Sequence, residues 1–178
     1  MTYEMAADGR SFTITRHIAA LRAEVFAAWT QPSRLRWFSD APDGVDDEAS
    51  VDLRPGGVWR VHLYEHGDSP DDYYTGGVYT EVVPGERLAF AHGAVRDGVV
   101  GAFPELDPTD LDGVPHVTIS LRDEVLDGVV GTVMTFHVDF APTVGLSEIA
   151  RWFGRGIRGG WDGTLDRLAP SLVNAPDR

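Results

Sequence analysis

Segments of alternating apolar and polar residues, separated by short turn signals, fill most of the middle of this 178-residue chain. Alternation with a period of two is typical of strands that bury one face, and turns of a few residues join antiparallel neighbours. The clearest turn is Pro55-Gly56-Gly57, which separates alternating segments at 49–53 and 58–64. The pattern therefore predicts an antiparallel sheet as the main element of the fold.

The remaining strands of the predicted sheet follow from the same alternation. They comprise residues 11–18, 73–83, 88–92, 117–121 and 132–140. In the first of them, Phe12, Ile14 and Ile18 share one side and would face the core. Together these segments predict a sheet of six to seven strands. Residues 93–115 interrupt the sheet with glycines, prolines and acidic residues, and predict a long loop of a kind that often forms a lid or a binding loop or is disordered.

Helical spacing appears at two places in the chain. Apolar residues recur at this spacing from Leu21 to Trp29, Pro32 interrupts the pattern, and a second short helix is expected to include Leu35 to Phe38. Near the C-terminus a short helical segment is followed by glycines at 154–160, which predict a flexible joint before the last helix. The apolar stripe of that helix consists of Ile157, Trp161, Leu165, Leu168 and Leu172.

The order of these elements predicts an α+β protein in which the C-terminal stripe faces the sheet. With 43% hydrophobic residues the chain has enough apolar side chains for one core. We predict a single domain over residues 11–173, with flexible ends at 1–10 and 174–178.

The composition restricts partners and location. The chain has 28 acidic residues against 15 basic ones and a formal charge of −13, so nucleic acid and anionic membrane surfaces are not expected partners. It contains neither lysine nor cysteine, which excludes a side-chain Schiff base, a thiolate nucleophile, a disulfide and a cysteine-ligated metal. No segment resembles a signal peptide or a membrane span, so the predicted location is the cytoplasm.

Three patterns resemble ligand-binding motifs, but none has the required context. Residues 154–159 (GRGIRG) match a dinucleotide fingerprint, yet they follow a predicted helix instead of a strand. Residues 110–113 (DLDG) resemble part of a calcium loop, but that alignment places Pro108 and Ile119 at ligand positions. The six histidines lack a paired spacing typical of zinc sites. The sequence therefore predicts no cofactor and no metal.

His92 is the histidine with the clearest inward position. It continues the side of its strand that holds Leu88 and Phe90. A hydrogen-bonded core residue is the favoured interpretation, and a catalytic base is the alternative. The chain has no nucleophile elbow and no carboxylate pair with a spacing that indicates acid–base work, so no catalytic residue is predicted.

Aromatic residues make up 10% of the chain. Most such rings fill cores, but a strongly curved sheet over one helix can leave a pocket lined by them. We predict that the ligand-binding residues are Trp37, Phe38, Trp59, Tyr79, Phe90, His92, Met134, Phe136, Trp161 and Leu165. Trp161 would form one wall and gate entry, because Gly159 and Gly160 each lower helix stability by about 1 kcal/mol relative to alanine.

Five sequence blocks occur in an order that resembles a known family. They are Trp29-Thr30-Gln31-Pro32 with Leu35 and Trp37, 52–59 (DLRPGGVW), 77–79 (GVY), 83–88 (VPGERL) and 160–168 (GWDGTLDRL). Together they resemble the activator of heat shock protein 90 ATPase homologue (AHSA1-like) branch of the SRPBCC, or START-like, superfamily, from about Phe12 to Leu172. The resemblance implies the helix-grip (Bet v 1-like) fold, in which a long C-terminal helix lies across a curved antiparallel sheet and a cavity opens between them.

The resemblance leaves three functions open, because a fold does not fix a function. The first is binding of a small apolar or aromatic molecule in the cavity. The second is an aromatase/cyclase-like or hydrolytic enzyme that uses the same cavity, with His92 or Tyr79 moving protons. The third is co-chaperone-like binding of a heat shock protein, which rests on the family name alone. A homodimer formed through an exposed aromatic patch is also compatible with the sequence.

Overall fold

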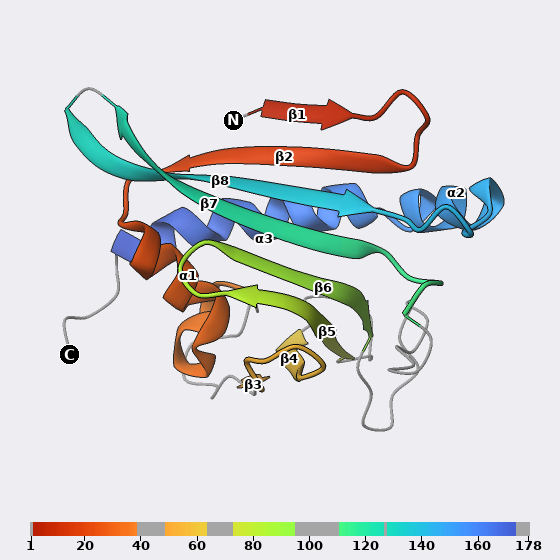
Figure 1. Ribbon diagram of the computed structural model, residues 1–178, viewed down its shortest axis with the longest axis horizontal. Coiled ribbons are helices and arrows are strands. Elements are labelled where there is room, and N and C mark those ends of the chain that lie inside the picture. Colours follow the sequence, from red (N-terminus) through yellow and green to blue (C-terminus); the bar gives the residue numbers. More distant parts are fainter. Residues whose placement is uncertain (1, 39–48, 64–72, 95–110, 127, 174–178) are drawn as a thin grey trace, which may run out of the picture.

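The computed structural model describes residues 2–38, 49–63, 73–94, 111–126 and 128–173. Within these residues one sheet contains eight strands, and every neighbouring pair is antiparallel. The strands are β1 (Thr2–Met5), β2 (Ser11–Ile18), β3 (Ala49–Val51), β4 (Val58–Leu63), β5 (Tyr73–Val83), β6 (Arg87–Ala94), β7 (His116–Leu126) and β8 (Val129–Asp139). Their order across the sheet is β1-β2-β8-β7-β6-β5-β4-β3, so the first two strands lie next to the last strand, β8 (Figure 1).

The helices gather on one face of this sheet. They are α1 (Arg22–Thr30), the 3₁₀ helix η1 (Pro32–Trp37), α2 (Leu146–Gly154) and α3 (Ile157–Val173). α3 lies behind the sheet in Figure 1 and crosses β7 and β8, and it contacts α1 and η1. No helix among the described residues is long and apolar enough to cross a membrane.

The core lies between the sheet and α3. On the sheet side, Ile14 of β2 is paired with Phe136 of β8, which is also paired with Ile119 of β7. All three side chains are buried, as are Leu165 and Leu168 on the apolar stripe of α3. Burial of these apolar groups drives the helix onto the sheet. The predicted α+β helix-grip arrangement, with two short helices after the strand at 11–18, is confirmed.

The strand count differs from the prediction, because the sheet has eight strands instead of six to seven. The additional strand is β1, which lies inside the segment predicted to be a flexible N-terminus. It pairs with β2 from Thr2↔Thr15 to Met5↔Phe12. Only Tyr3 of this strand packs against the core. The prediction was wrong here because backbone hydrogen bonds, which leave no hydrophobic pattern in the sequence, hold most of this edge strand in place.

The joint before the last helix covers fewer residues than predicted. α2 ends at Gly154 and α3 begins at Ile157, whereas Gly159 and Gly160 lie inside α3. Gly156 has a φ of 83°, a left-handed conformation that glycine adopts without steric cost. Its N–H donates to the Phe153 carbonyl at 3.0 Å, as a helix C-terminus requires. The break between the helices is therefore Arg155–Gly156.

Two other predicted segments lie outside the described residues. These are residues 95–110 of the predicted loop and the C-terminal end at 174–178. Gly93 and Ala94, which were assigned to the start of that loop, instead extend β6.

The first turn of α1 lacks a side-chain cap. Leu21 occupies the N-cap position with extended backbone angles, and its side chain is 59% exposed. We expect Leu21→Asp to raise the free energy of unfolding by about 1 kcal/mol, because the new carboxylate can accept from the N–H of Ala23 or Glu24. Urea unfolding measures the change. Leu21→Ala has no side-chain acceptor and should give no such gain; equal stabilisation by both variants would contradict the explanation.

Candidate functional site

Nine of the ten predicted ligand-binding residues belong to the hydrophobic core, and the tenth, His92, is buried against it. They come from η1, β4, β5, β6, β8 and α3, with Phe38 directly after η1. Strand alternation explains this convergence, because Trp59, Phe90, His92 and Phe136 occupy positions on the face of the sheet that α3 covers. The structure therefore brings together residues that are far apart in the chain, such as Phe38 and Trp161, which contact each other although they are 123 positions apart.

Trp161 of α3 lies at the centre of a set of contacting rings, here called the aromatic cluster. Its ring centroid is 4.6 Å from that of Phe136, 4.9 Å from His92, 5.5 Å from Phe38 and 6.4 Å from Trp29. The two rings of the Phe38–Trp161 pair are nearly perpendicular, at 88°. Such edge-to-face contacts stabilise aromatic pairs beyond their buried area.

The cluster extends from Trp161 in two directions, toward β4 and β5 and toward α1 and η1. Phe38 contacts Trp59 at 5.4 Å, Trp59 contacts Phe90 at 5.0 Å, and Phe90 contacts Tyr79 at 6.2 Å. On the α1 side, Trp37 lies 4.8 Å from Trp29 and 5.2 Å from Phe38. Met134 and Leu165 belong to the same core without being part of this ring network.

Trp29 belongs to the cluster but was not among the predicted site residues. It contacts Trp37, Phe38, Phe136 and Trp161. Its position on the apolar side of the predicted helix at 21–29 was a usable signal. The helical spacing does not say which neighbours that side will meet, because this depends on how α1 docks against α3.

The indole N–H groups of the cluster differ in their hydrogen bonding. Trp37 Nε1 donates to the Ala28 carbonyl at 3.0 Å. Trp29 Nε1 and Trp59 Nε1 are buried and have no partner among the residues that the structure describes. Buried donors without acceptors cost free energy and are rare in folded proteins. These two N–H groups are therefore available to an acceptor that the described chain does not supply.

His92 is held by a backbone hydrogen bond, as the favoured sequence interpretation expected. Its Nδ1 lies 3.0 Å from the Gly76 carbonyl, which can only accept, so Nδ1 carries the proton and Nε2 keeps a lone pair. Burial lowers the pKa of His92 to about 4, and the bond to Gly76 offsets only part of this effect. His92 is therefore neutral at pH 7 and a weak base.

Tyr79 is the other residue to which the enzyme hypothesis assigned proton transfer. Burial raises the pKa of its hydroxyl above the ordinary value for tyrosine, so the hydroxyl stays protonated at neutral pH. General acid–base catalysis works best when a pKa lies near the working pH. The pKa values of His92 and Tyr79 both move away from neutrality, which favours a binding role over proton transfer for these two residues.

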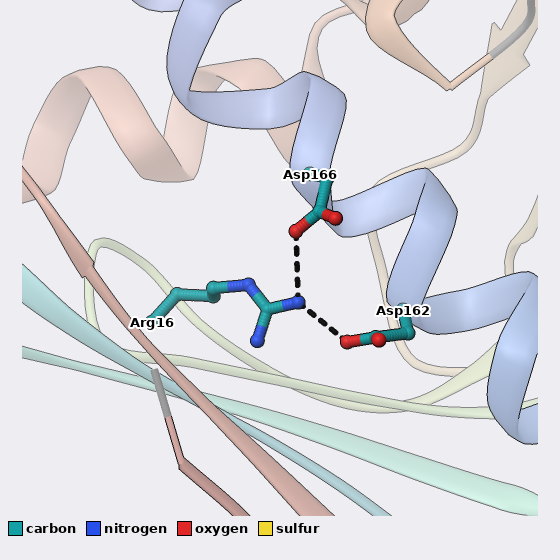
Figure 2. Close-up of polar contacts among 3 residues, drawn as sticks. All are labelled: Arg16, Asp162 and Asp166. Carbon is teal, nitrogen blue, oxygen red and sulfur yellow. Dashed lines mark hydrogen bonds and ion pairs between the residues drawn. The ribbon is translucent and has the colours of Figure 1, made fainter.

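The guanidinium group of Arg16 on β2 is a further polar group that is largely buried, and it faces α3. Arg16 Nη2 donates to Asp162 Oδ1 at 2.6 Å and to Asp166 Oδ1 at 3.0 Å (Figure 2). The Arg16 side chain is only 10% exposed, whereas its partners are 40% and 64% exposed. The two carboxylates lie one helical turn apart, so a single guanidinium bonds to both. This interaction connects α3 to the sheet.

Arg16 was not among the predicted site residues, although it alternates in phase with the inward residues Phe12, Ile14 and Ile18. A charged residue at an apolar position of a strand was the available signal. Its Nε and Nη1 atoms are buried and have no hydrogen-bond partner within the described residues. Nothing local predicts that its partners are Asp162 and Asp166, which follow it by 146 and 150 positions.

A separate hollow of about 300 Å³ opens near the junction of β2, β7 and β8. It is lined by His17, Ile18, Ala19, Glu124, Val129, Gly131 and Thr132. His17 Nδ1 and Glu124 Oε2 lie 2.6 Å apart beside it. None of the predicted site residues lines this hollow. The described part of the chain also contains no group of three or more histidine, aspartate or glutamate side chains placed to hold a metal ion.

The sequence and the fold both resemble known proteins. A family model described as "Activator of Hsp90 ATPase homolog 1-like protein" matches residues 19–172. The fold is similar to that of a Mycobacterium smegmatis protein, with a TM-score of 0.70, 19% identity and 97% of each chain covered. An Arthrobacter aurescens protein has a TM-score of 0.71 and 19% identity, covering 99% of this chain and 93% of its own.

A third solved structure is that of an AHSA1-like protein from Aeromonas hydrophila, with a TM-score of 0.58, 20% identity and 93% of each chain covered. At these identities the likeness concerns the fold alone. No curated protein matches the sequence.

Proposed function

Because the chain belongs to the family of Activator of Hsp90 ATPase homolog 1-like proteins, we propose that it binds a small hydrophobic or aromatic molecule between the sheet and α3. The observation that supports this proposal is the aromatic cluster around Trp161. Its rings come from α1, the η1 region, β4, β5, β6, β8 and α3, and only a few polar atoms lie among them. Apolar walls with few polar groups are the usual composition of ligand sites.

Binding at this place requires some rings to move apart, because they contact one another in the described state. The first turns of α3 can accommodate such a movement. A Cβ atom placed on Gly159, Gly160 or Gly163 would meet nothing within 4 Å. Glycine also weakens a helix interior. We propose that a ligand enters by displacing Trp161 together with this part of α3, while the contact of Arg16 with Asp162 and Asp166 limits the displacement.

Two measurements test the proposal. Native mass spectrometry of the purified protein looks for a bound molecule, and calorimetric titration with naphthalene and 2-naphthol measures the affinity for aromatic probes. We expect binding of at least one aromatic probe and a loss of about tenfold in affinity for Phe136→Leu, which removes a ring that contacts Trp161. Phe140→Leu is the matched control, because Phe140 packs against Trp152 and Phe153, outside the cluster. Equal losses in both variants, or no binding of any probe, would overturn the proposal.

A further inference from the structure

Trp59, Gly77 and His92 form one row across three neighbouring strands. Gly77 of β5 is paired with Trp59 of β4 on one side and with His92 of β6 on the other. Neighbouring strands lie about 4.8 Å apart, so the two side chains stand on either side of a residue that has none. Both also contact the ring of Phe90, at 5.0 Å and 6.5 Å. The row therefore places an indole and an imidazole around a small residue on the α3 side of the sheet.

The Trp59 indole N–H lies directly over Gly77. A Cβ atom built on Gly77 would be 2.8 Å from Trp59 Nε1. Trp59 is 3% exposed, and its Nε1 has no hydrogen-bond partner among the described residues. An indole N–H can only donate. This side of the row therefore presents one buried donor without an acceptor.

The other side of the row presents an acceptor. His92 is 6% exposed, and its Nδ1–H is directed to the carbonyl of Gly76, the residue next to Gly77. The remaining ring nitrogen, Nε2, has a lone pair, and no bond from a described residue occupies it. Because the ring lies 4.9 Å from that of Trp161, Nε2 belongs to the surface that a displaced Trp161 would uncover.

We propose that Trp59 Nε1 and His92 Nε2 recognise a hydroxyl group on the aromatic ligand. A hydroxyl can accept from Trp59 and donate to His92 at the same time. A carboxylate can only accept, so it would face the His92 lone pair without a proton to share, in a protein with a formal charge of −13. A plain hydrocarbon would leave both groups unsatisfied. This inference rests on the proposed function and narrows its ligand class to neutral aromatic alcohols and phenols.

Three probes of the same ring system test the inference: naphthalene, 2-naphthol and 2-naphthoate. Calorimetry at pH 7 should give at least about tenfold tighter binding of 2-naphthol than of the other two, the effect of one net hydrogen bond. His92→Phe and Trp59→Phe each keep a ring and remove one polar atom, so each should reduce the preference to about twofold. Trp152→Phe is the control, because Trp152 packs beside Phe140, outside the aromatic cluster, and its exchange should leave the preference intact.

The outcomes separate this inference from the proposed function. If naphthalene and 2-naphthol bind equally, or 2-naphthoate binds most tightly, hydroxyl recognition is wrong while aromatic binding stands. If no probe binds, the proposed function fails and this inference with it. Should a variant not fold, the ¹⁵N-labelled wild-type protein decides the question: the Trp59 indole proton should move downfield with 2-naphthol and not with naphthalene, and an unchanged resonance would contradict the inference.

Discussion

Lowering the pH from 7 to 4 is expected to remove about 3 kcal/mol from the free energy of unfolding through His92 alone. The folded-state pKa of His92 is about 4, below the ordinary value of 6.5. At pH values between about 4 and 6.5, His92 binds a proton in the unfolded chain but not in the folded protein. Stability due to this residue is therefore constant above about pH 6.5, falls as the pH decreases through the window, and levels off below about pH 4.

Urea unfolding of the wild type and of His92→Asn at a series of pH values measures this effect. Asparagine does not titrate, and its Nδ2 lies where Nδ1 of histidine lies, so it can still donate to the Gly76 carbonyl. Carboxylates titrate in both proteins, and the difference between the two pH profiles isolates His92. We expect the wild type to lose stability more steeply between pH 6.5 and 4. Parallel profiles would contradict this expectation, because they would show that His92 binds its proton equally well in the folded and the unfolded protein.

Trp161→Ala is expected to cost about 3–5 kcal/mol of unfolding free energy, because it removes the ring at the centre of the aromatic cluster and leaves a cavity. Thermal and urea denaturation measure the loss. Trp152→Ala is a matched control: this ring is also buried, but it belongs to α2 and packs beside Phe140, outside the aromatic cluster. Both variants should lose stability, and only Trp161→Ala should change the affinity for an aromatic probe.

The milder exchange Trp161→Phe separates a wall of the binding site from ordinary core packing. It keeps an aromatic ring in contact with Phe136 and His92 while it changes the shape of the site. If Trp161 gates the ligand, the variant should keep its melting temperature and lose affinity. A variant that loses stability and keeps its affinity would show that Trp161 serves only the core.

The strands and the C-terminal helix could be predicted because burial leaves a periodic pattern in the sequence. Phe12, Ile14 and Ile18 mark one face of β2, and Trp161, Leu165 and Leu168 mark one face of α3. The same periodicity placed Trp59, Phe90, His92 and Phe136 on the covered face of the sheet, which is why the predicted site residues lie in the core together. These features depend on residues close in the chain, so local sequence is sufficient to determine them.

Contacts between distant residues depended on the tertiary structure. The partners of Arg16 lie on α3, 146 and 150 positions further along the chain, so no local pattern specifies Asp162 and Asp166. β1 is held mainly by backbone pairing with β2, which requires no particular side chains. The chain determined which faces are apolar, and hence its fold class. Docking of α1 and α3 on the sheet decided which polar atoms found partners. Among the described residues it left Trp59 Nε1 without a partner and bound His92 to Gly76 through Nδ1, because hydrogen bonding depends on distances that periodicity does not encode.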